Sequence, residues 1–74
     1  MLLLNENIKP NKTIYYLSSL IYKKIIKNNY TVRELYNAML IDLNDLDYDH
    51  YIYALNFLFL LEKIKLEKDV IKKC

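Results

Sequence analysis

The sequence predicts a small, mainly α-helical domain that ends in a β ribbon, and three observations support this fold class. Apolar residues recur at helical spacing in three successive segments between about residues 13 and 63. Short polar stretches rich in Asn and Asp separate these segments. After the third segment the apolar spacing changes from helical to alternating, which is typical of a strand. A chain of 74 residues is long enough for one domain, so residues 1–74 are expected to form a single unit.

The first helix is expected from about Thr13 to Lys27, with Asn11 or Thr13 as its N-cap. Its apolar stripe consists of Ile14, Leu17, Ile21 and Ile25, with Leu20 beside them. Several lysines lie in its last turns, where positive charge suits the helix macrodipole. The pair Asn28 and Asn29 is expected to end the helix.

The second helix is expected to follow Thr31 and has the clearest signals in the chain. Thr31 and Glu34 have the spacing of a capping box, in which each side chain bonds the other residue's backbone amide. Its apolar stripe consists of Val32, Leu35, Tyr36, Met39, Leu40 and Leu43. Asn44 and Asp45 are expected to end this helix.

The third helix is expected from about Asp47 to Lys63 and is apolar on nearly all sides. One stripe consists of Tyr51, Ile52, Leu55, Leu58 and Phe59, and a second of Tyr53, Phe57, Leu60 and Ile64. A helix of this kind must be buried on nearly all sides. Either the rest of the chain covers both stripes, or the second stripe binds a partner protein. An additional stripe on the first helix, Tyr15, Tyr22 and Ile26, favours the partner.

The C-terminal residues predict a hairpin. Residues 63–67 alternate in polarity, Lys68 and Asp69 form the turn, and residues 70–72 return. Three helices followed by a two-stranded ribbon are typical of a winged helix, so the fold is expected to be winged-helix-like. The apolar start, Met1 to Leu4, would add a short strand or an arm. Because Gly is absent, positive φ angles are expected at Asn28, Asn29, Asn44 and Asp69.

Composition excludes several classes of function. Without Gly the chain has neither a phosphate-binding P-loop nor a dinucleotide-binding fingerprint. A formal net charge of +2 is too small to indicate a nucleic-acid or membrane role by itself. The longest apolar stretch, residues 51–61, is too short to span a bilayer, and the N-terminal residues are not those of a signal peptide. With Cys74 as the single cysteine, a cytoplasmic protein without disulfides is expected.

Candidate metal and catalytic motifs are weak. Asp45, Asp47 and Asp49 resemble the opening of a calcium loop, but His50 stands at the Gly position and Asn56 at that of the bidentate Glu. N-capping of the third helix explains these Asp residues better. His50 and Cys74 are too few ligands for a zinc site. We therefore expect no enzyme activity, no metal, no cofactor and no small-molecule ligand.

The third helix also argues against direct reading of DNA. The helix that enters the major groove carries Arg, Lys, Asn or Gln toward the bases. Here no Lys or Arg precedes Lys63, and Asp47 and Asp49 would repel phosphate. The alternative function is a small winged-helix DNA-binding protein that contacts phosphates weakly through the basic hairpin, with Lys65, Lys68, Lys72 and Lys73. Interleaved acidic residues (Glu62, Glu67 and Asp69) make a solvated ribbon the simpler interpretation.

Two segments resemble the middle component 6 family of ABC-three-component systems, which includes the small subunit of Lamassu-type anti-phage defence systems. Residues 1–14 are similar to the family's short apolar start, polar turn and Ser/Thr-capped first helix. Residues 49–64, DHYIYALNFLFLLEKI, resemble its helix of Asp, aromatic, Ala-Leu and Leu-aromatic-Leu that leads into a strand. Two positions depart from the family pattern, Leu4 in place of Pro and Glu62 in place of Gly.

The resemblance implies an accessory subunit of a bacterial complex with an SMC-like ABC ATPase and an effector, often a nuclease. Nucleotide hydrolysis and DNA cleavage would then belong to these partners, and this chain would meet DNA only indirectly or weakly. The residues expected to bind the protein partner are Leu2, Leu3, Leu4, Tyr15, Tyr22, Tyr53, Phe57 and Leu60.

Overall fold

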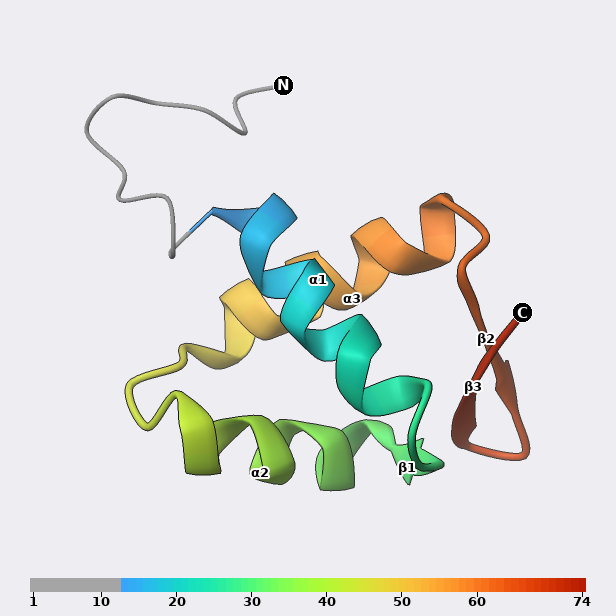
Figure 1. The fold of residues 1–74 in the computed structure, drawn as a ribbon, viewed down its shortest axis with the longest axis horizontal. Coiled ribbons are helices and arrows are strands. Elements are labelled where there is room, and N and C mark those ends of the chain that lie inside the picture. Colours follow the sequence, from blue (N-terminus) through green and yellow to red (C-terminus); the bar gives the residue numbers. More distant parts are fainter. Residues whose placement is uncertain (1–12) are drawn as a thin grey trace.

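The computed structural model describes residues 13–74 as three helices and a three-stranded antiparallel sheet (Figure 1). In chain order the elements are α1 (Ile14–Ile25), β1 (Tyr30–Thr31), α2 (Val32–Asp42), α3 (Tyr48–Leu60), β2 (Ile64–Glu67) and β3 (Val70–Lys73). The predicted fold class, mainly helical with a small β ribbon, is confirmed. The likeness to a winged helix stays a prediction, and the predicted N-terminal strand or arm lies outside the described residues.

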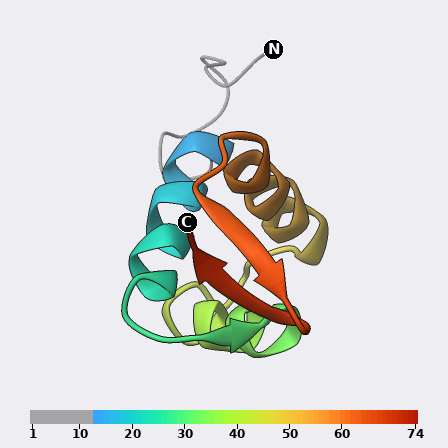
Figure 2. The ribbon, with the colours of Figure 1, turned by 90° about the vertical axis from the view of Figure 1, so that its right-hand side faces the viewer.

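The sheet contains the predicted hairpin and one strand that the sequence did not reveal. Its strand order is β1-β3-β2, so β3 lies in the middle. In β1, Tyr30 pairs with Ile71 and Thr31 with Val70. This short strand ties the α1–α2 connection to the hairpin, as Figure 2 shows. Two residues are too few to show alternation, and Thr31 also serves as a helix cap, so no sequence signal marked β1.

Each helix begins at a predicted cap. Thr13 caps α1, Thr31 caps α2 and Asp47 caps α3. The capping box is complete, because the backbone N–H of Glu34 donates to Thr31 Oγ1 at 3.2 Å and that of Thr31 donates to Glu34 Oε1 at 2.9 Å. These side chains satisfy backbone donors that would otherwise have no partner within the helix.

The C-terminal end of α3 is a Schellman motif formed without glycine. The N–H of Lys63 donates to Leu58 O and that of Glu62 to Phe59 O, each at 3.0 Å. This pattern requires a left-handed residue at Glu62, whose φ is 58°. Glycine would adopt this conformation at a lower cost in free energy than Glu62 does. Helix α3 consequently ends at Leu60 and not near Lys63, where the sequence predicted its end.

Positive φ angles occur elsewhere than the sequence predicted, with the exception of Asp69. Within residues 13–74 they are found at Glu62, Lys68 and Asp69. The predicted positions Asn28, Asn29 and Asn44 were therefore wrong. Lys68 and Asp69 alone connect β2 to β3, and positive φ at both central residues is the geometry of a type I′ hairpin turn.

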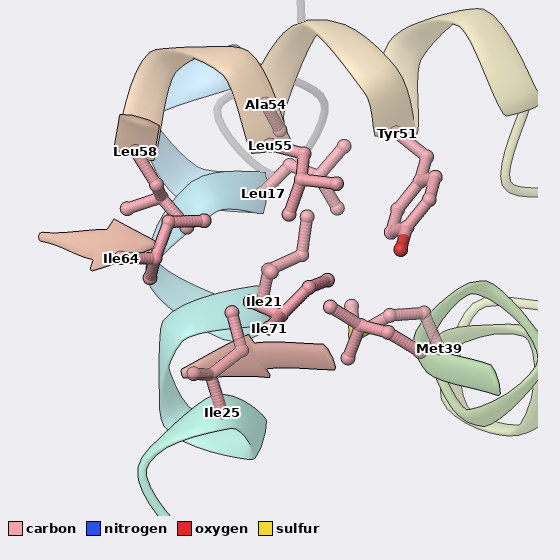
Figure 3. Packing of buried hydrophobic residues seen from close by; sticks show 11 residues of the cluster. Leu17, Ile21, Ile25, Met39, Tyr51, Ala54, Leu55, Leu58, Ile64 and Ile71 are labelled. Atoms are coloured by element: carbon pink, nitrogen blue, oxygen red, sulfur yellow. The ribbon is translucent and has the colours of Figure 1, made fainter. Parts of the chain in front are cut away.

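The core lies between α1, α2, α3 and the inner side of the sheet, and α1 packs most extensively against α3. Its buried members are Leu17, Ile21, Ile25, Leu35, Met39, Tyr51, Ala54, Leu55, Leu58, Ile64 and Ile71, most of which Figure 3 labels. The predicted stripe of α1 supplies Leu17, Ile21 and Ile25, and that of α2 supplies Leu35 and Met39. The helical spacing therefore predicted the inward faces of both helices.

Candidate protein-binding surface

The two faces of α3 differ in what covers them. Tyr51, Ala54, Leu55 and Leu58 point into the core and are buried. The opposite face carries exposed residues at successive spacings of four, three and four, namely Asp49, Tyr53, Asn56 and Leu60. Tyr53 retains 66% and Leu60 82% of its accessible surface. The outward face of α3, defined by Tyr53 and Leu60, therefore exposes two large apolar side chains beside the polar Asp49 and Asn56.

Tyr51 fixes the rotation of α3 about its axis. Its ring is fully buried, and its hydroxyl donates to the carbonyl oxygen of Val32 at 2.7 Å. Burial, together with the nearby Tyr48, raises the pKa of the Tyr51 hydroxyl above its ordinary value, so this donor keeps its proton. Because Tyr51 anchors the inward side of α3 to the start of α2, Tyr53 and Leu60 are held on the side away from the core.

An aromatic cluster fixes the turn between α2 and α3. Tyr36, Tyr48 and Tyr51 pack together with ring centroids 5.0–5.9 Å apart. The Tyr36 hydroxyl donates to Leu46 O at 2.9 Å, which joins α2 to the residues before α3. Such contacts stabilise a particular angle between the two helices, because aromatic pairs prefer edge-on and tilted arrangements.

Two further residues adjoin the outward face of α3. Phe57 is half-buried on the flank of the helix, so only part of its ring is free for a partner. Leu61, half exposed, follows Leu60 directly at the end of the helix. Sequence reasoning missed Leu61 because it fell outside both apolar stripes. Its accessibility follows from the early end of α3, which the unusual conformation of Glu62 produces.

The other predicted protein-binding residues are arranged less uniformly. Tyr15 on α1 is 66% exposed, whereas Tyr22 is half-buried and packs against the core cluster. Ile26, directly after α1, is also exposed. Leu2, Leu3 and Leu4 lie outside the described residues. Of the predicted set, the structure therefore brings together Tyr53, Phe57 and Leu60 on one helix.

Asp47, directly before α3, serves as its capping group, and Asp49 lies in the first turn. Asp47 Oδ2 accepts hydrogen bonds from the backbone N–H groups of Asp49 and His50, at 3.1 and 3.2 Å. His50 is exposed in the first turn, as predicted. Within residues 13–74, no group of three or more His, Cys, Asp or Glu side chains could hold a metal ion.

The hairpin lysines divide into paired and unpaired members. Glu67 accepts from both Lys65 and Lys72, at 3.4 and 3.3 Å, and these contacts hold the pKa of its carboxyl below the usual range. Lys68 and Lys73 form no ion pair with any residue of 13–74. Half of the predicted phosphate-binding set is therefore already partnered by a carboxylate.

Comparison with known proteins places the chain in a family. The model of the ABC-three component (ABC-3C) system middle component 6 family matches residues 3–74. The chain therefore belongs to this family, which confirms the resemblance found in its sequence. No curated protein and no solved structure matches it. Among the described residues, no helix is long and apolar enough to cross a membrane.

Proposed function

We propose that this chain is a non-catalytic accessory subunit of a bacterial, Lamassu-type anti-phage defence complex, and that it binds the SMC-like ABC ATPase or the effector nuclease. Membership in a three-component system supports this proposal, because a middle component implies partners within the same system. The outward face of α3 is the proposed centre of the interface. Tyr15, Tyr22 and the N-terminal residues Leu2, Leu3 and Leu4 would extend it.

The observation that carries this proposal is the exposure of Tyr53 and Leu60 on a helix whose rotation is fixed. Water contact with this apolar surface is unfavourable by about 25 cal/mol per Å², so covering it with a partner releases free energy. Tyrosine is also among the residues enriched at protein interfaces. The nearby Asp49 makes the same face unfavourable for phosphate, so a protein suits it better than DNA.

A matched pair of substitutions tests this interface. Leu60 on α3 and Ile41 on α2 are 82% and 83% exposed, so Leu60→Asp and Ile41→Asp add the same charge at equally accessible apolar positions. Each variant is co-expressed with an affinity-tagged ATPase and with the effector encoded beside it. We expect Leu60→Asp to lose co-purification and Ile41→Asp to retain it. Circular dichroism of each isolated variant provides the control for folding.

Three results would contradict the proposal. Retention of the partner by both variants would exclude the α3 face as the interface. Equal loss by both variants would indicate a general effect of added negative charge. Loss of helicity in Leu60→Asp alone would show that Leu60 supports the fold of the chain instead of contacting a partner.

A further inference from the structure

A hollow lined by basic residues lies between the end of β3 and the connection from α1 to β1. Its volume is about 450 Å³, and it is lined by Lys27, Asn28, Asn29, Lys72 and Lys73, together with two isoleucines at the end of α1. In Figure 2 the end of β3 lies beside α1, so lysines distant in sequence meet here. None of the lining residues is acidic. We call this surface the basic hollow.

Within residues 13–74, two of the three lysines in the basic hollow have no acidic partner. Lys27 and Lys73 form no ion pair with any described residue, whereas Lys72 lies 3.3 Å from Glu67. Lys27 lies just after the C-cap of α1, where the helix macrodipole favours a positive charge, whereas Lys73 comes from β3, a separate element. Like charges placed together without compensation favour the binding of an anion.

A second hollow continues the same surface along α1. Its volume is about 340 Å³; it shares Lys27 and Asn28 with the basic hollow and is also lined by Lys23 and Lys24. Lys24 is neutralised by Asp42 at 3.0 Å, while Lys23 is unpaired among the described residues. Lys23, Lys27 and Lys73 thus form a continuous cationic surface over two adjacent hollows.

We propose that the basic hollow binds the phosphates of a nucleic-acid duplex, independently of the protein interface on α3. Lysines and asparagine amides supply the donors that phosphate contacts use, and several cations in succession suit a repeating anionic backbone. No aromatic residue lines the basic hollow, and Tyr30, which lines the second hollow, is half-buried and packs against the core cluster, so this surface lacks the exposed rings on which single-stranded bases stack. The proposed phosphate-binding residues differ from the hairpin lysines that the sequence predicted for this role. The basic hollow includes Lys27 and does not include the hairpin turn.

The distribution of acidic residues would orient the duplex. The turn between α2 and α3 and the hairpin lie at opposite ends of the long axis in Figure 1. Asp45, Asp47 and Asp49 lie in and directly after that turn, and residues 43–62 contain no Lys or Arg. Residues 63–73 instead carry five lysines against Glu67 and Asp69, so the end distant from the hairpin is the less favourable one for phosphate. A duplex is therefore attracted to the end that carries the basic hollow.

The test measures binding of the full 74-residue chain to a fluorescently labelled DNA duplex by anisotropy across a salt titration. The double substitution Lys27→Gln with Lys73→Gln removes the two unpaired lysines of the basic hollow. We expect about tenfold weaker binding at low salt and a slope of log affinity against log salt reduced by about 2, one for each lost phosphate contact. The control, Lys63→Gln with Lys68→Gln, removes two unpaired hairpin lysines and should remain within about twofold of the unsubstituted chain.

Several outcomes would overturn this assignment. One is that the unsubstituted chain does not bind the duplex at low salt. Another is equal weakening by the two double variants, which would show that only net charge matters. A competition experiment adds a poly-glutamate peptide to the chain bound to the duplex. Displacement of the duplex by an equimolar amount of this peptide would assign the basic hollow to an acidic protein segment instead.

Discussion

Helices α2 and α3 have similar lengths and both pack on the core, yet their outward faces differ. The outward face of α2 carries mainly polar residues (Arg33, Glu34, Asn37 and Asp42), with Ile41 as a single apolar exception. The outward face of α3 carries Tyr53 and Leu60, and Leu61 follows at its end. Isolated apolar residues on a surface are ordinary, whereas several on one helix face indicate a contact site.

The fold requires different shares of the apolar residues in α2 and in α3. For α2, one apolar stripe faces the core and one capping box begins the helix, and Ile41 is the single exposed apolar residue of the helix. For α3, the inward residues complete the core, but nothing in residues 13–74 requires Tyr53 or Leu60 to be apolar. The proposed interface would account for this excess of apolar residues on α3.

The largest effect is expected from the inward face of α3. Leu55→Ala deletes a buried side chain and should lower the free energy of unfolding by about 3 kcal/mol, because it removes apolar contacts and leaves a cavity. Leu60→Ala on the same helix should change it by less than about 0.5 kcal/mol, since Leu60 is exposed. Urea denaturation of both variants measures the difference. A loss at Leu60 comparable to that at Leu55 would remove the distinction between the two faces.

A smaller effect is expected at Tyr51, which links α3 to α2. Tyr51→Phe removes the hydrogen bond to Val32 O and leaves a partly buried carbonyl without that donor, which should cost about 1 kcal/mol. Thermal unfolding of the variant at neutral pH measures this loss. An unchanged stability would show that the hydroxyl does not hold the two helices together.

The pH dependence of stability provides a separate test of Tyr51. Burial raises the pKa of Tyr51 above the ordinary 10.0, so the folded state holds its proton more tightly than the unfolded state does. The stability associated with this proton is fully present below about pH 10 and decreases as the pH rises toward the folded pKa. In Tyr51→Phe this part of the alkaline loss should be absent. An identical alkaline decline in both proteins would contradict the assignment.

The end of α3 offers a stabilising substitution. Glu62 has a φ of 58°, a conformation that costs a residue with a Cβ atom about 1–2 kcal/mol. Glu62→Gly should relieve this cost, partly offset by the greater freedom of glycine in the unfolded chain, for a net gain of about 0.5–1 kcal/mol. Glu62→Ala, which keeps the Cβ atom, is the control and should not increase stability. Equal stabilisation by both substitutions would indicate that removal of the charge is responsible.

Much of the fold could be predicted because its signals are local. Helical spacing identified the buried stripes of α1 and α2, and Thr31 with Glu34 predicted the capping box. The left-handed residues could not be predicted in the same way. Glu62 adopts a positive φ because the chain reverses from α3 into β2 at this position. Lys68 adopts one because only two residues connect β2 to β3. Both residues therefore take φ angles that their own preferences disfavour.

The candidate site was predictable in part. The second apolar stripe on α3 identified Tyr53 and Leu60, which are the exposed residues, but it also included Ile64, which is buried in β2. Periodicity alone could not show that the helix ends before Ile64. The basic hollow could not be predicted because Lys27 and Lys73 are 46 positions apart and meet only through the pairing of β1 with β3.

The central claim is that this chain works through an apolar interface with its partner proteins. The most direct measurement is co-expression with the other components of its three-component system, followed by size-exclusion chromatography with light scattering at low and high salt. We predict a complex that includes this chain and persists at high salt, because an apolar interface is not screened by ions. A chain that elutes alone at both salt concentrations would contradict the accessory-subunit function.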